Sequence, residues 1–557
     1  MSKKPLSKKN RIDELEAKLL SPHKTVRDAV HGDIMITHLE TSIIDTRDFQ
    51  RLRWLKQLGL TNLVYPCANH TRFDHSLGTL AMAQKIIDIL NSNPFKDIEV
   101  SSYDRFLIRL CALLHDVSNV PYGHTLEDEG KLLQSQWKDE NRVKRFLDEG
   151  SDIAKALSED EILKELARTT LDKKYDPKEV LKQIKEILIS NEVKTVESLK
   201  KPFIADIVGN TLCADLLDYI KRDVYFTGLR EAYDERFLSY LYVTNYRGKP
   251  RLVLRLIKPR TGEVRRDVLS ELLHLLRLRY SLAEKVYYHH SKIAASAMLI
   301  SAISAMEQSK KLTIPDLYGM TDEGLLQSME KDGDEIAKYL AGKLRRRQLY
   351  RMVYQLTYTE KALGRPESTR KEELIDELRN SLNRYNRERE LESKNNLKPG
   401  RVVIYCPGPE MGQKAVETIV KWGSRETDIG PLEQIADERI RNEIGSSIVK
   451  KHLELWKMYV LVDPILTDVE QCQVGNDCKS IFGLPSAEEK HTSLTDEIPT
   501  YFLRLATKWD SEHAAEDSVT IKELNLIHKQ SATWAEKKDW LNYDQFCKLM
   551  EDIRKKS

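Results

Sequence analysis

The sequence predicts a mainly α-helical protein: a helical bundle with small β-hairpin insertions, followed by a smaller C-terminal α+β unit. Apolar residues recur at helical spacing through most of residues 39–396. Stretches of β-type residues around glycine turns predict hairpins over 25–36 and 240–257. Further along, apolar runs at 401–406 and 455–463 predict strands. With 557 residues, the chain can bury one large core and a smaller domain.

Composition shifts divide the chain into segments. The polar, lysine-rich residues 1–24 predict a flexible N-terminal segment. Residues 25–397 form the main domain, in which alternating charged and aliphatic residues near 130–200 predict a helical insertion on the surface. The composition changes after Lys398-Pro-Gly400. The remaining segments are a small α+β domain over 398–485 and a helical C-terminal segment over 486–557.

Hydrophobic periodicity predicts the individual elements. The first hairpin turns at His31 and Gly32, and Tyr65-Pro66 interrupts the helical pattern before His70. The expected helices cover 11–20, 39–58, 76–90, 103–116, 203–226 (one helix or a pair), 268–306 (interrupted near 287–290), 336–356 and 371–396. Beyond residue 398, helical stretches are expected at 431–455, 501–509 and 534–550.

The composition excludes several classes of protein. Charged residues make up 32% of the chain and balance to a net charge of +2, so no global basic field indicates nucleic acid or membrane. No apolar run is long enough for a membrane span, and the basic N-terminus lacks the apolar region of a signal peptide. Seven scattered cysteines fit reduced thiols. We therefore expect a soluble cytoplasmic protein.

The main chemical signal is His115-Asp116, at the end of an apolar run that begins near Phe106. Neighbouring His and Asp side chains can offer a nitrogen and an oxygen ligand to one ion, a mixture that suits a catalytic divalent metal better than a closed structural zinc site. His75 precedes a second helical pattern, and Asp215 opens a third. These four residues are candidate ligands of a divalent metal ion (Mg, Mn, Fe or Zn). The alternative is four ordinary polar residues at helix ends.

Four motifs surround these candidate ligands: Arg27-Asp-Ala-Val-His-Gly-Asp33, Ile43-Ile-Asp-Thr-Arg-Asp-Phe-Gln-Arg-Leu-Arg53, Lys56-Gln-Leu-Gly59 and Arg72-Phe-Asp-His-Ser-Leu-Gly78. The ordered ligand set resembles the HD superfamily of metal-dependent phosphohydrolases. The motifs look like its deoxynucleoside triphosphate triphosphohydrolase branch, which includes bacterial dGTPases and the vertebrate enzyme that joins a sterile-alpha-motif domain to an HD domain. The resemblance runs from about residue 25 to about residue 360. It implies an HD helical bundle and hydrolysis of deoxynucleoside triphosphates to deoxynucleoside and triphosphate.

The resemblance also assigns catalytic roles. His124 matches a general acid that protonates the leaving oxygen, and Glu127 matches an acidic residue that orients this histidine. Alternatively, the stretch that begins at Thr125 is a helix-capping box. The sequence departs from the branch at two positions. Asn119 stands where the family often has a second histidine, and Asp139 stands where the vertebrate enzyme has a further active-site histidine, so the acid network is rebuilt.

Further residues match positions that hold the substrate in this branch. Guanidinium and ammonium groups suit a triphosphate; any one of them is alternatively a solvated surface charge. Two tyrosines on one helix are alternatively core residues. The candidates are Arg72, Arg279 and Lys221 (or Arg222) for the triphosphate, Gln57, Leu58, Tyr219 and Asp223 for the sugar, and Tyr287 with Tyr288 for stacking against sugar and base.

The resemblance implies regulation as well. Asp45, Gln50 and Arg53 match residues that read a guanine at the activator site of the vertebrate enzyme, and Arg347 and Arg351 resemble contacts to a second activator nucleotide. Nucleotide-driven assembly into a homo-oligomer, a dimer or a tetramer, follows as a hypothesis. The alternative is a polar helix face that carries Gln50 and Arg53.

Two other functions stay open. The first is an HD phosphohydrolase for another phosphoester: a nucleoside monophosphate, a signalling nucleotide or single-stranded nucleic acid. The second is a non-catalytic nucleotide sensor, although a sensor has no need for four intact ligands. The basic stretch 343–351 could bind nucleic acid, but a run of charges is usually a solvated face.

Overall fold

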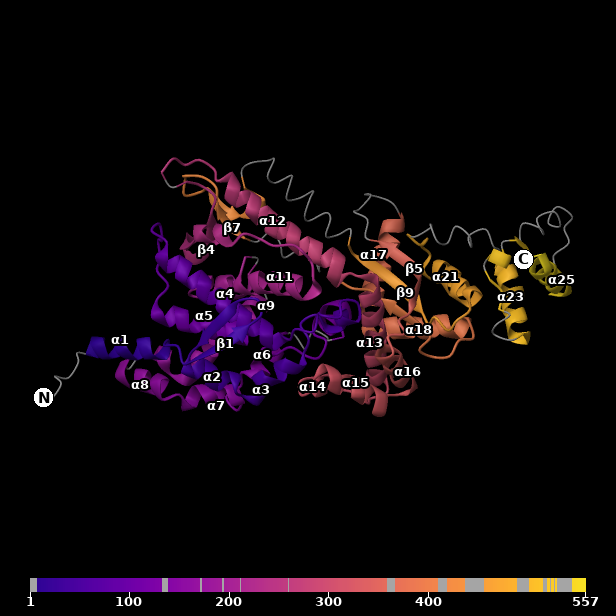
Figure 1. Cartoon of the computed structure of the whole chain (residues 1–557), viewed down its shortest axis with the longest axis horizontal. Helices are drawn as coiled ribbons and strands as arrows, with labels where there is room; N and C mark the ends of the chain where they lie inside the picture. Colours follow the sequence, from indigo (N-terminus) through magenta and orange to yellow (C-terminus); the bar gives the residue numbers. More distant parts are fainter. Residues whose placement is uncertain are drawn as a thin grey trace.

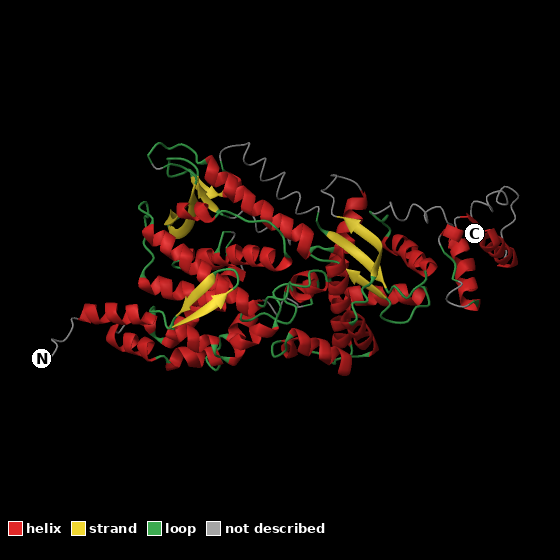
Figure 2. Cartoon of the chain, in the orientation of Figure 1, coloured by secondary structure: helices red, strands yellow, loops and turns green. Residues whose placement is uncertain are grey.

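Helices dominate the described part of the protein, as the sequence predicts, and this part also contains three small sheets (Figure 2). The computed structural model describes residues 8–132, 139–170, 173–192, 195–210, 212–258, 260–357, 366–408, 418–435, 455–487, 500–513, 518–520, 522–524, 526–527 and 543–556. The molecule is elongated, with α1 near one end and α25 near the other (Figure 1). In this described part of the chain, every helix is too short or too polar to cross a membrane.

The N-terminal part builds the first hairpin and the two helices that lead into the His-Asp motif. Its elements are α1 (Lys8–Leu19), β1 (Lys24–Asp28), β2 (Gly32–Ile36), α2 (His38–Ile44), α3 (Arg47–Gln50), η1 (Arg51–Trp54), η2 (Gly59–Leu63), α4 (Arg72–Ser92) and α5 (Ser102–Leu114). Residues 8–19, assigned above to a flexible segment, pack against α8 as α1, which buries Leu15 and Leu19 and pairs Arg11 with Glu165.

The continuous helix expected over 39–58 is wrong. The chain leaves α2 at Asp45 and starts again at Thr46, whose extended backbone (φ −67°, ψ 151°) lets its side chain accept a hydrogen bond from the Phe49 N–H. This N-cap competes with continuation of α2. Ile43 and Phe49 are both buried in spite of the break, so two short helices bury the apolar residues that one helix was expected to bury.

The insertion expected near 130–200 is helical. It leads into the helix pair that the sequence places over 203–226. The elements are η3 (Thr125–Glu129), α6 (Asp139–Phe146), α7 (Asp152–Glu159), α8 (Glu161–Thr170), η5 (Lys173–Tyr175), α9 (Pro177–Glu192), η6 (Val196–Ser198), α10 (Pro202–Gly209) and α11 (Ala214–Thr227).

A second hairpin and a long interrupted helix follow, as expected. The elements are η7 (Glu235–Tyr240), β3 (Leu241–Tyr246), β4 (Lys249–Arg255), α12 (Arg266–Leu282), η8 (Ala283–Tyr287), α13 (His290–Gln308), α14 (Ile314–Leu317), α15 (Asp322–Lys331) and α16 (Glu335–Arg345). The helix expected over 336–356 stops halfway. Arg347 has a positive φ of 54°, and the residues from 351 onward pair as a strand.

The C-terminal part contributes strands to two sheets. Its elements are β5 (Arg351–Thr357), α17 (Pro366–Arg379), α18 (Ser381–Lys394), β6 (Val402–Tyr405), β7 (Ile419–Lys421), β8 (Ile429–Pro431), η10 (Leu432–Gln434), β9 (Lys457–Val462), α21 (Asp468–Phe482), α23 (Thr500–Glu512) and α25 (Tyr543–Lys556). The helical middle predicted at 431–455 lies largely outside the described residues, as does 534–542.

Strands on both sides of residue 398 share sheets. The strand order is β5-β9-β6 in one sheet, where β9 pairs antiparallel with both neighbours, and β3-β4-β7-β8 in another, where β7 runs parallel to β4. A cluster that includes Tyr354, Ile404 and Val460 packs against the first of these sheets. This pairing argues against an independent α+β domain that begins at residue 398.

The helices of the predicted metal site meet at a glycine. α4 packs against both α5 and α11 (Figure 1). A Cβ atom added at Gly78 of α4 would lie 1.9 Å from an Asp218 carboxylate oxygen on α11. Glycine therefore allows the close approach that brings His75 and Asp215 together.

A truncation tests the shared sheet. A chain that ends at residue 397 lacks β9 and β6, so β5 loses its partner strand and Tyr354 loses its apolar neighbours. We expect a melting temperature at least about 5 °C lower, roughly 2 kcal/mol for a domain of this size, or precipitation. A chain that ends at residue 487 keeps the sheet and serves as the control. Equal melting temperatures for both chains, measured by calorimetry, would establish an independent domain before residue 398.

Candidate metal centre

Three of the four predicted ligands converge on one point. His75 lies in the first turn of α4, His115 follows the last residue of α5, and Asp215 is the second residue of α11. The two histidine Nε2 atoms are 3.2 Å apart, and the His75 Nε2 atom is 3.0 Å from Asp215 Oδ1. One ligand atom from each residue lies within 4.8 Å of the others, the spacing of a shared metal ion.

The hydrogen bonds at the far side of each ring favour metal binding. His75 donates from Nδ1 to Asp218 Oδ2 at 2.6 Å, and His115 donates from Nδ1 to the Ala112 carbonyl oxygen at 2.8 Å. In the neutral rings both protons therefore sit on Nδ1, and both Nε2 lone pairs point into the same space. Without a metal ion, the His75 ring satisfies this arrangement by taking up a second proton, which its Nε2 donates to Asp215. Imidazole and carboxylate donors together fit a divalent ion.

Asp116, the fourth predicted ligand, lies beside this group. Its Oδ1 is 3.6 Å from His115 Nε2 and its Oδ2 is 3.8 Å from His75 Nε2. Arg72 donates to Oδ2 at 2.7 Å and Asn119 to Oδ1 at 2.6 Å. Burial raises the pKa of Asp116, but the charge and hydrogen bond of Arg72 together with the two neighbouring histidines outweigh burial, so the pKa falls below its usual range. The carboxylate is thus ionised and held in place.

Electrostatics around His75 are dominated by carboxylates. Burial of the ring lowers its pKa, but hydrogen bonds to Asp215 and Asp218 more than compensate, and the pKa is raised to about 10. Burial raises the pKa of Asp215, but its hydrogen bond with His75 and the charges of the two neighbouring histidines together outweigh burial, so the pKa is lowered. The centre therefore holds excess negative charge that attracts a cation.

Asp218 is the main residue that sequence reasoning missed. Its carboxylate is fully buried and accepts hydrogen bonds from His75, from His31 Nε2 at 2.6 Å and from Arg222 at 2.9 Å. Arg222 in turn binds Asp28, at the end of β1. Arg222, offered above as a triphosphate contact, is thus enclosed in this network. The sequence does carry a signal, because Asp218 follows Asp215 by three residues on one helix face.

The candidate acid lies on the loop that borders Arg72. A Cβ atom at Gly123 would lie 2.6 Å from an Arg72 guanidinium nitrogen, so the loop touches the arginine that holds Asp116. His124 follows and is exposed. Glu127 lies close enough for its charge to raise the pKa of Arg72. The alternative of a capping box at Thr125 is wrong, because residues 125–129 form a π-turn without a side-chain cap.

Asp139 is the first residue of α6, and its side chain lies outside the described part of the structure.

The predicted sugar residues form a buried polar cluster. Asp223 is almost fully buried and accepts hydrogen bonds from Tyr287 at 2.5 Å and from His70 Nε2 at 2.9 Å. Gln57 is also buried, and its side-chain oxygen has no hydrogen-bond partner among the described residues. Leu58 is half-buried against the core.

The basic candidates fall into different places. Arg279 is half-buried and lies near Tyr219 and Tyr287, since its charge lowers the pKa of both, although burial raises both overall. Arg72 is buried against Asp116. Lys221 instead forms an ion pair with Glu235 and lies over the Tyr233 ring. Its charge is thus engaged away from the metal ligands.

The predicted activator residues cluster at the break between α2 and α3. Gln50 donates to the Ile44 carbonyl oxygen at 2.9 Å, next to the exposed Asp45, and accepts a hydrogen bond from Arg53 at 2.8 Å. The alternative of a polar helix face stays open, because Gln50 and Arg53 lie one turn apart on the continuous turns of α3 and η1, beyond the break. Arg347 donates to the Leu63 carbonyl oxygen at 2.6 Å, while Arg351 is exposed at the start of β5.

A second carboxylate that sequence reasoning missed ties two loops of the site together. Asp322, at the start of α15, is buried and accepts hydrogen bonds from the backbone N–H groups of Lys56 and Tyr122, each at 2.8 Å. These groups belong to the loop before Gln57 and to the loop before His124. No local pattern around Asp322 indicates this role, because both partners are more than 190 residues away in sequence.

Comparison with known families agrees with this geometry. Residues 72–220, which contain all four predicted ligands, match the family described as HD domain. The chain contains an HD domain. Residues 273–431, from α12 to β8, match the HD associated region.

The relatives share a limited part of the chain. An uncharacterized protein of Methanocaldococcus jannaschii is 31% identical over 336 residues. The deoxynucleoside triphosphate triphosphohydrolase SAMHD1 homolog of Dictyostelium discoideum is 27% identical over 355 residues. Each match covers 60% of this chain and 60% of the relative, which is less than two thirds of either. The human deoxynucleoside triphosphate triphosphohydrolase SAMHD1 is 26% identical over 305 residues, 52% of this chain and 46% of its own length.

Among solved structures, a phosphohydrolase from Bacteroides thetaiotaomicron has a similar fold, with a TM-score of 0.51 and 19% sequence identity. The match covers 79% of this HD-domain protein and all of that chain. At this identity the likeness concerns the fold.

Asp218→Asn tests the support of the centre. An amide holds the His75 Nδ1 proton less strongly than a carboxylate, so we expect divalent-ion affinity to fall roughly 10- to 100-fold, measured by calorimetric titration with Mn²⁺. His31→Gln keeps Asp218 and Arg222 and should give a smaller loss. Asp234→Asn removes an exposed charge elsewhere and should change nothing. Unchanged affinity in both site variants would contradict this account.

Proposed function

We propose that this HD-domain protein hydrolyses deoxynucleoside triphosphates to deoxynucleoside and inorganic triphosphate, with a divalent metal ion. One observation carries the proposal: the Nε2 atoms of His75 and His115 and the carboxylate of Asp215 converge beside a fixed Arg72–Asp116 pair. The names of the relatives from Dictyostelium and human point to the same substrate class.

His75, His115 and Asp215 would hold the metal, with Asp116 alongside. When bound, the ion would supply a Lewis acid for a phosphoryl oxygen. Arg72 keeps Asp116 ionised and oriented. Asp218 and the Ala112 carbonyl fix both imidazole rings. These residues therefore provide a preorganised anionic site into which a metal–triphosphate complex can enter.

The departing 5′-oxygen needs a proton. His124 is exposed on a loop that touches Arg72, so it can reach a substrate beside the metal ligands. A histidine is suited to hold a proton near neutral pH and to transfer it to the leaving oxygen. Water would attack the α-phosphorus on the opposite side. Glu127, whose charge acts on Arg72, would keep His124 oriented.

Selection of a deoxyribose would fall to the buried polar cluster. Asp223 is already engaged by Tyr287 and His70, while the Gln57 side-chain oxygen is buried and free to accept a sugar hydroxyl. A 2′-hydroxyl placed against this packed wall would stay unpaired, at a cost of about 1–3 kcal/mol. Arg279 lies near Tyr219 and Tyr287 and would contact the triphosphate.

A second candidate is a phosphohydrolase for another phosphoester, such as a nucleoside monophosphate, a signalling nucleotide or single-stranded nucleic acid. Asn119 favours it, because this side chain donates to Asp116 where a catalytic histidine would otherwise stand. A non-catalytic nucleotide sensor is less favoured, since the intact ligand group has no function in a sensor.

Product analysis distinguishes these functions. The four deoxynucleoside triphosphates and the four ribonucleotides are each incubated with Mg²⁺ or Mn²⁺, alone and in mixtures that could supply an activator. We expect inorganic triphosphate from the deoxynucleotides only, because a 2′-hydroxyl is excluded. The His115→Ala, Asp116→Ala double variant should lose at least about 1,000-fold in rate. Orthophosphate release, or turnover of monophosphates alone, would support the second candidate, and no turnover would favour a sensor.

We also propose that a nucleotide bound near Asp45, Gln50 and Arg53 activates the enzyme by driving assembly into a dimer or tetramer. Arg53 donates to Gln50, and Gln50 donates to the Ile44 carbonyl oxygen, next in the chain to the exposed Asp45. Sedimentation equilibrium with a deoxynucleotide and GTP should show a mass increase, and Arg53→Glu should abolish it. Lys331→Glu, at an exposed position on α15, is the charge-matched control. No mass change with any nucleotide would remove this part of the proposal.

A further inference from the structure

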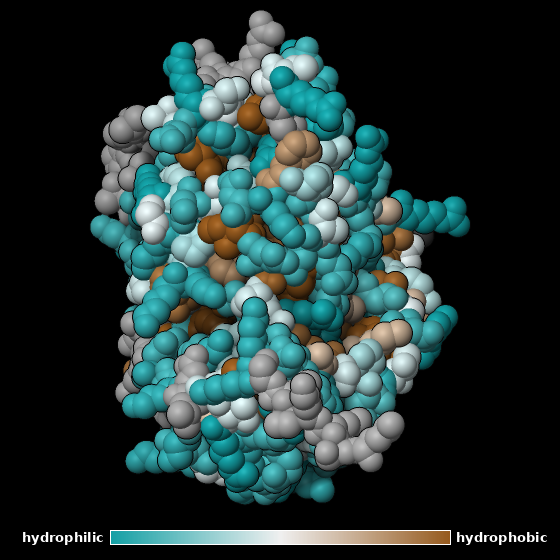
Figure 3. Space-filling model, turned by 90° about the vertical axis from the view of Figure 1, so that its left-hand side faces the viewer, coloured by the Kyte–Doolittle hydropathy of each residue, from teal (hydrophilic) through white to brown (hydrophobic). Residues whose placement is uncertain are grey.

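A strongly basic stretch lies at the end of the molecule that carries β4. Residues 247–266 contain eight arginine or lysine residues and a single acidic one, whereas the whole chain has a net charge of only +2. The stretch covers the β3–β4 turn, β4 and the loop to α12 (Figure 1). This end faces the viewer in Figure 3, where hydrophilic side chains surround smaller apolar areas.

Only part of this charge is neutralised. Arg251 binds Asp206 at 2.7 and 2.8 Å and also pairs with Glu197. Lys258 pairs with Glu263 at 2.7 Å, and Arg265 lies 3.8 Å from Asp267. The other five basic residues have no carboxylate partner within the described part of the chain: Arg247, Lys249, Arg255, Arg260 and Arg266. Such a surplus of cations favours an anionic partner.

The sheet behind these cations has two different faces. Leu241, Val243 and Leu254 belong to the main core. Tyr242 and Tyr246 are spaced so that they share the opposite face of β3. They pack with Val253 and Ile419 in a small cluster of their own. We call this second side the outer face.

Guanidinium groups lie over both tyrosines of the outer face. The Arg255 guanidinium is 4.0 Å from the centre of the Tyr242 ring, and that of Arg247 is 5.1 Å from the Tyr246 ring. Arg255 also lies 5.6 Å from the ring of Phe95, which is 46% exposed. Planar cations stacked on aromatic rings offer flat surfaces on which a base can stack and donors that reach phosphate.

The neighbouring strand extends the sheet. Ile419 of β7 belongs to the outer face, whereas Val420 and Trp422 pack against the main core on the other side. The loop after Trp422 approaches the basic loop, since a Cβ atom at Gly262 would lie 3.0 Å from the Ser424 hydroxyl oxygen. The outer face thus carries guanidinium groups over Tyr242 and Tyr246, with the exposed ring of Phe95 beside Arg255. The seven residues of β4 alone span about 23 Å, room for a few nucleotides.

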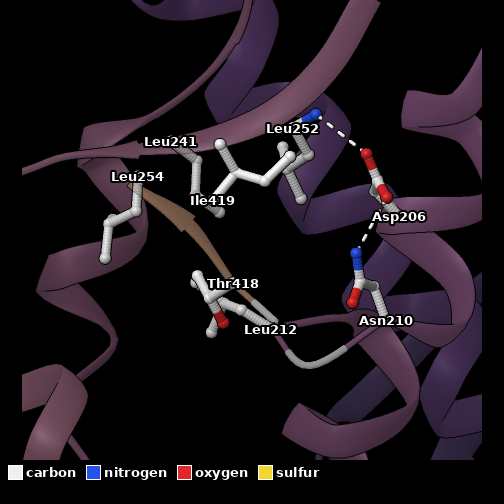
Figure 4. Close-up of a pocket in the computed structure, with 8 residues that line it drawn as sticks. All are labelled: Asp206, Asn210, Leu212, Leu241, Leu252, Leu254, Thr418 and Ile419. Atoms are coloured by element: carbon white, nitrogen blue, oxygen red, sulfur yellow. Dashed lines mark hydrogen bonds between the residues drawn. The ribbon is translucent and has the colours of Figure 1, made fainter. Parts of the chain in front are cut away.

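The pocket behind this sheet is too small for a ligand. The pocket between α10 and the inner side of the sheet has a volume of about 10 Å³, room for a single water molecule. Its walls include Asp206, which accepts hydrogen bonds from the Leu252 N–H and from Asn210 (Figure 4). Asp206 therefore links the sheet to α10 by hydrogen bonds, and a ligand of this sheet would bind on its outer face.

We propose that the outer face, with Arg247, Arg255 and Phe95 at its centre, binds single-stranded nucleic acid. Arginine and lysine side chains would contact successive phosphates, and bases would stack on Phe95 and on the guanidinium planes, as in other single-strand-binding surfaces. A duplex hides its base faces and would use only the charges. This site is separate from the metal ligands, so its function does not depend on hydrolysis.

Binding is measured by fluorescence anisotropy with the full-length protein in EDTA, which prevents metal-dependent cleavage. The probes are a labelled 20-nucleotide oligo(dT), a duplex of the same length and vesicles that contain phosphatidylserine. We expect the single strand to bind at least about 10-fold more tightly than the duplex. The Arg247→Glu, Arg260→Glu, Arg266→Glu variant should lower this affinity more than 10-fold and reduce the slope of log K against log salt by about 2.

Matched variants separate this surface from general charge effects. Lys310→Glu, Lys331→Glu, Lys338→Glu makes the same charge change at exposed positions on the other part of the molecule and should keep wild-type affinity. Lys310 also matches the positive φ of Arg247. Phe95→Ala should weaken binding of the single strand severalfold and leave binding of the duplex unchanged. Melting temperature confirms that each variant is folded.

Three results would overturn the proposal. The first is no binding of the single strand by the wild type. The second is an equal loss in both triple variants. The third is a preference for the duplex or the vesicles, which would assign the basic surface to another polyanion. Hydrolysis of nucleotides is assayed in parallel, and an unchanged rate in the Arg247, Arg260, Arg266 variant would show that the proposed function and this surface stand independently.

Discussion

The candidate metal centre depends on one buried carboxylate. Asp218 accepts hydrogen bonds from His75, a predicted metal ligand, from His31 in the hairpin turn and from Arg222, which is itself paired with Asp28. A buried charge is tolerated only when its partners are all in place, so these contacts fix α4, α11 and the first hairpin relative to each other. The position of His75 against Asp215 follows from that arrangement, and so does the ability to hold a metal ion.

The sequence located the ligands but not what supports them. His75, His115 and Asp215 could be found because each lies at the edge of a regular apolar pattern, and adjacency pairs His115 with Asp116. Their convergence could not be predicted without the helix packing. That packing requires a glycine at position 78, because any side chain there would collide with Asp218. Asp218 has one local signal, its place three residues after Asp215 on α11, but its contacts with His75 and His31 depend on the packing of distant elements. Lys221 was misplaced for the same reason, because proximity in sequence does not fix the side of a helix.

The fold shows a similar division between local and distant information. Hairpins with glycine turns and long periodic helices were predictable, since neighbouring residues decide them. Three predicted helices failed where another contact competed: the N-caps of Thr46 and Asn380 split those over 39–58 and 371–396, and pairing of β5 with the distant β9 ends the one over 336–356. The sheets that join residues on both sides of 398 were likewise invisible, because β7 pairs with a strand more than 160 residues earlier. Pairing between strands that are distant in the chain produces no periodic pattern in the local sequence.

Asp322 has a consequence for how the parts of the molecule communicate. It belongs to the HD-associated region, yet it holds the backbone of both loops that border the metal ligands. Any event that stabilises α15 in this position lowers the entropic cost of ordering the two loops together, and by thermodynamic reciprocity a ligand that orders the loops also stabilises α15. The two halves of the chain are thus thermodynamically coupled, and the coupling runs through the carboxylate of Asp322.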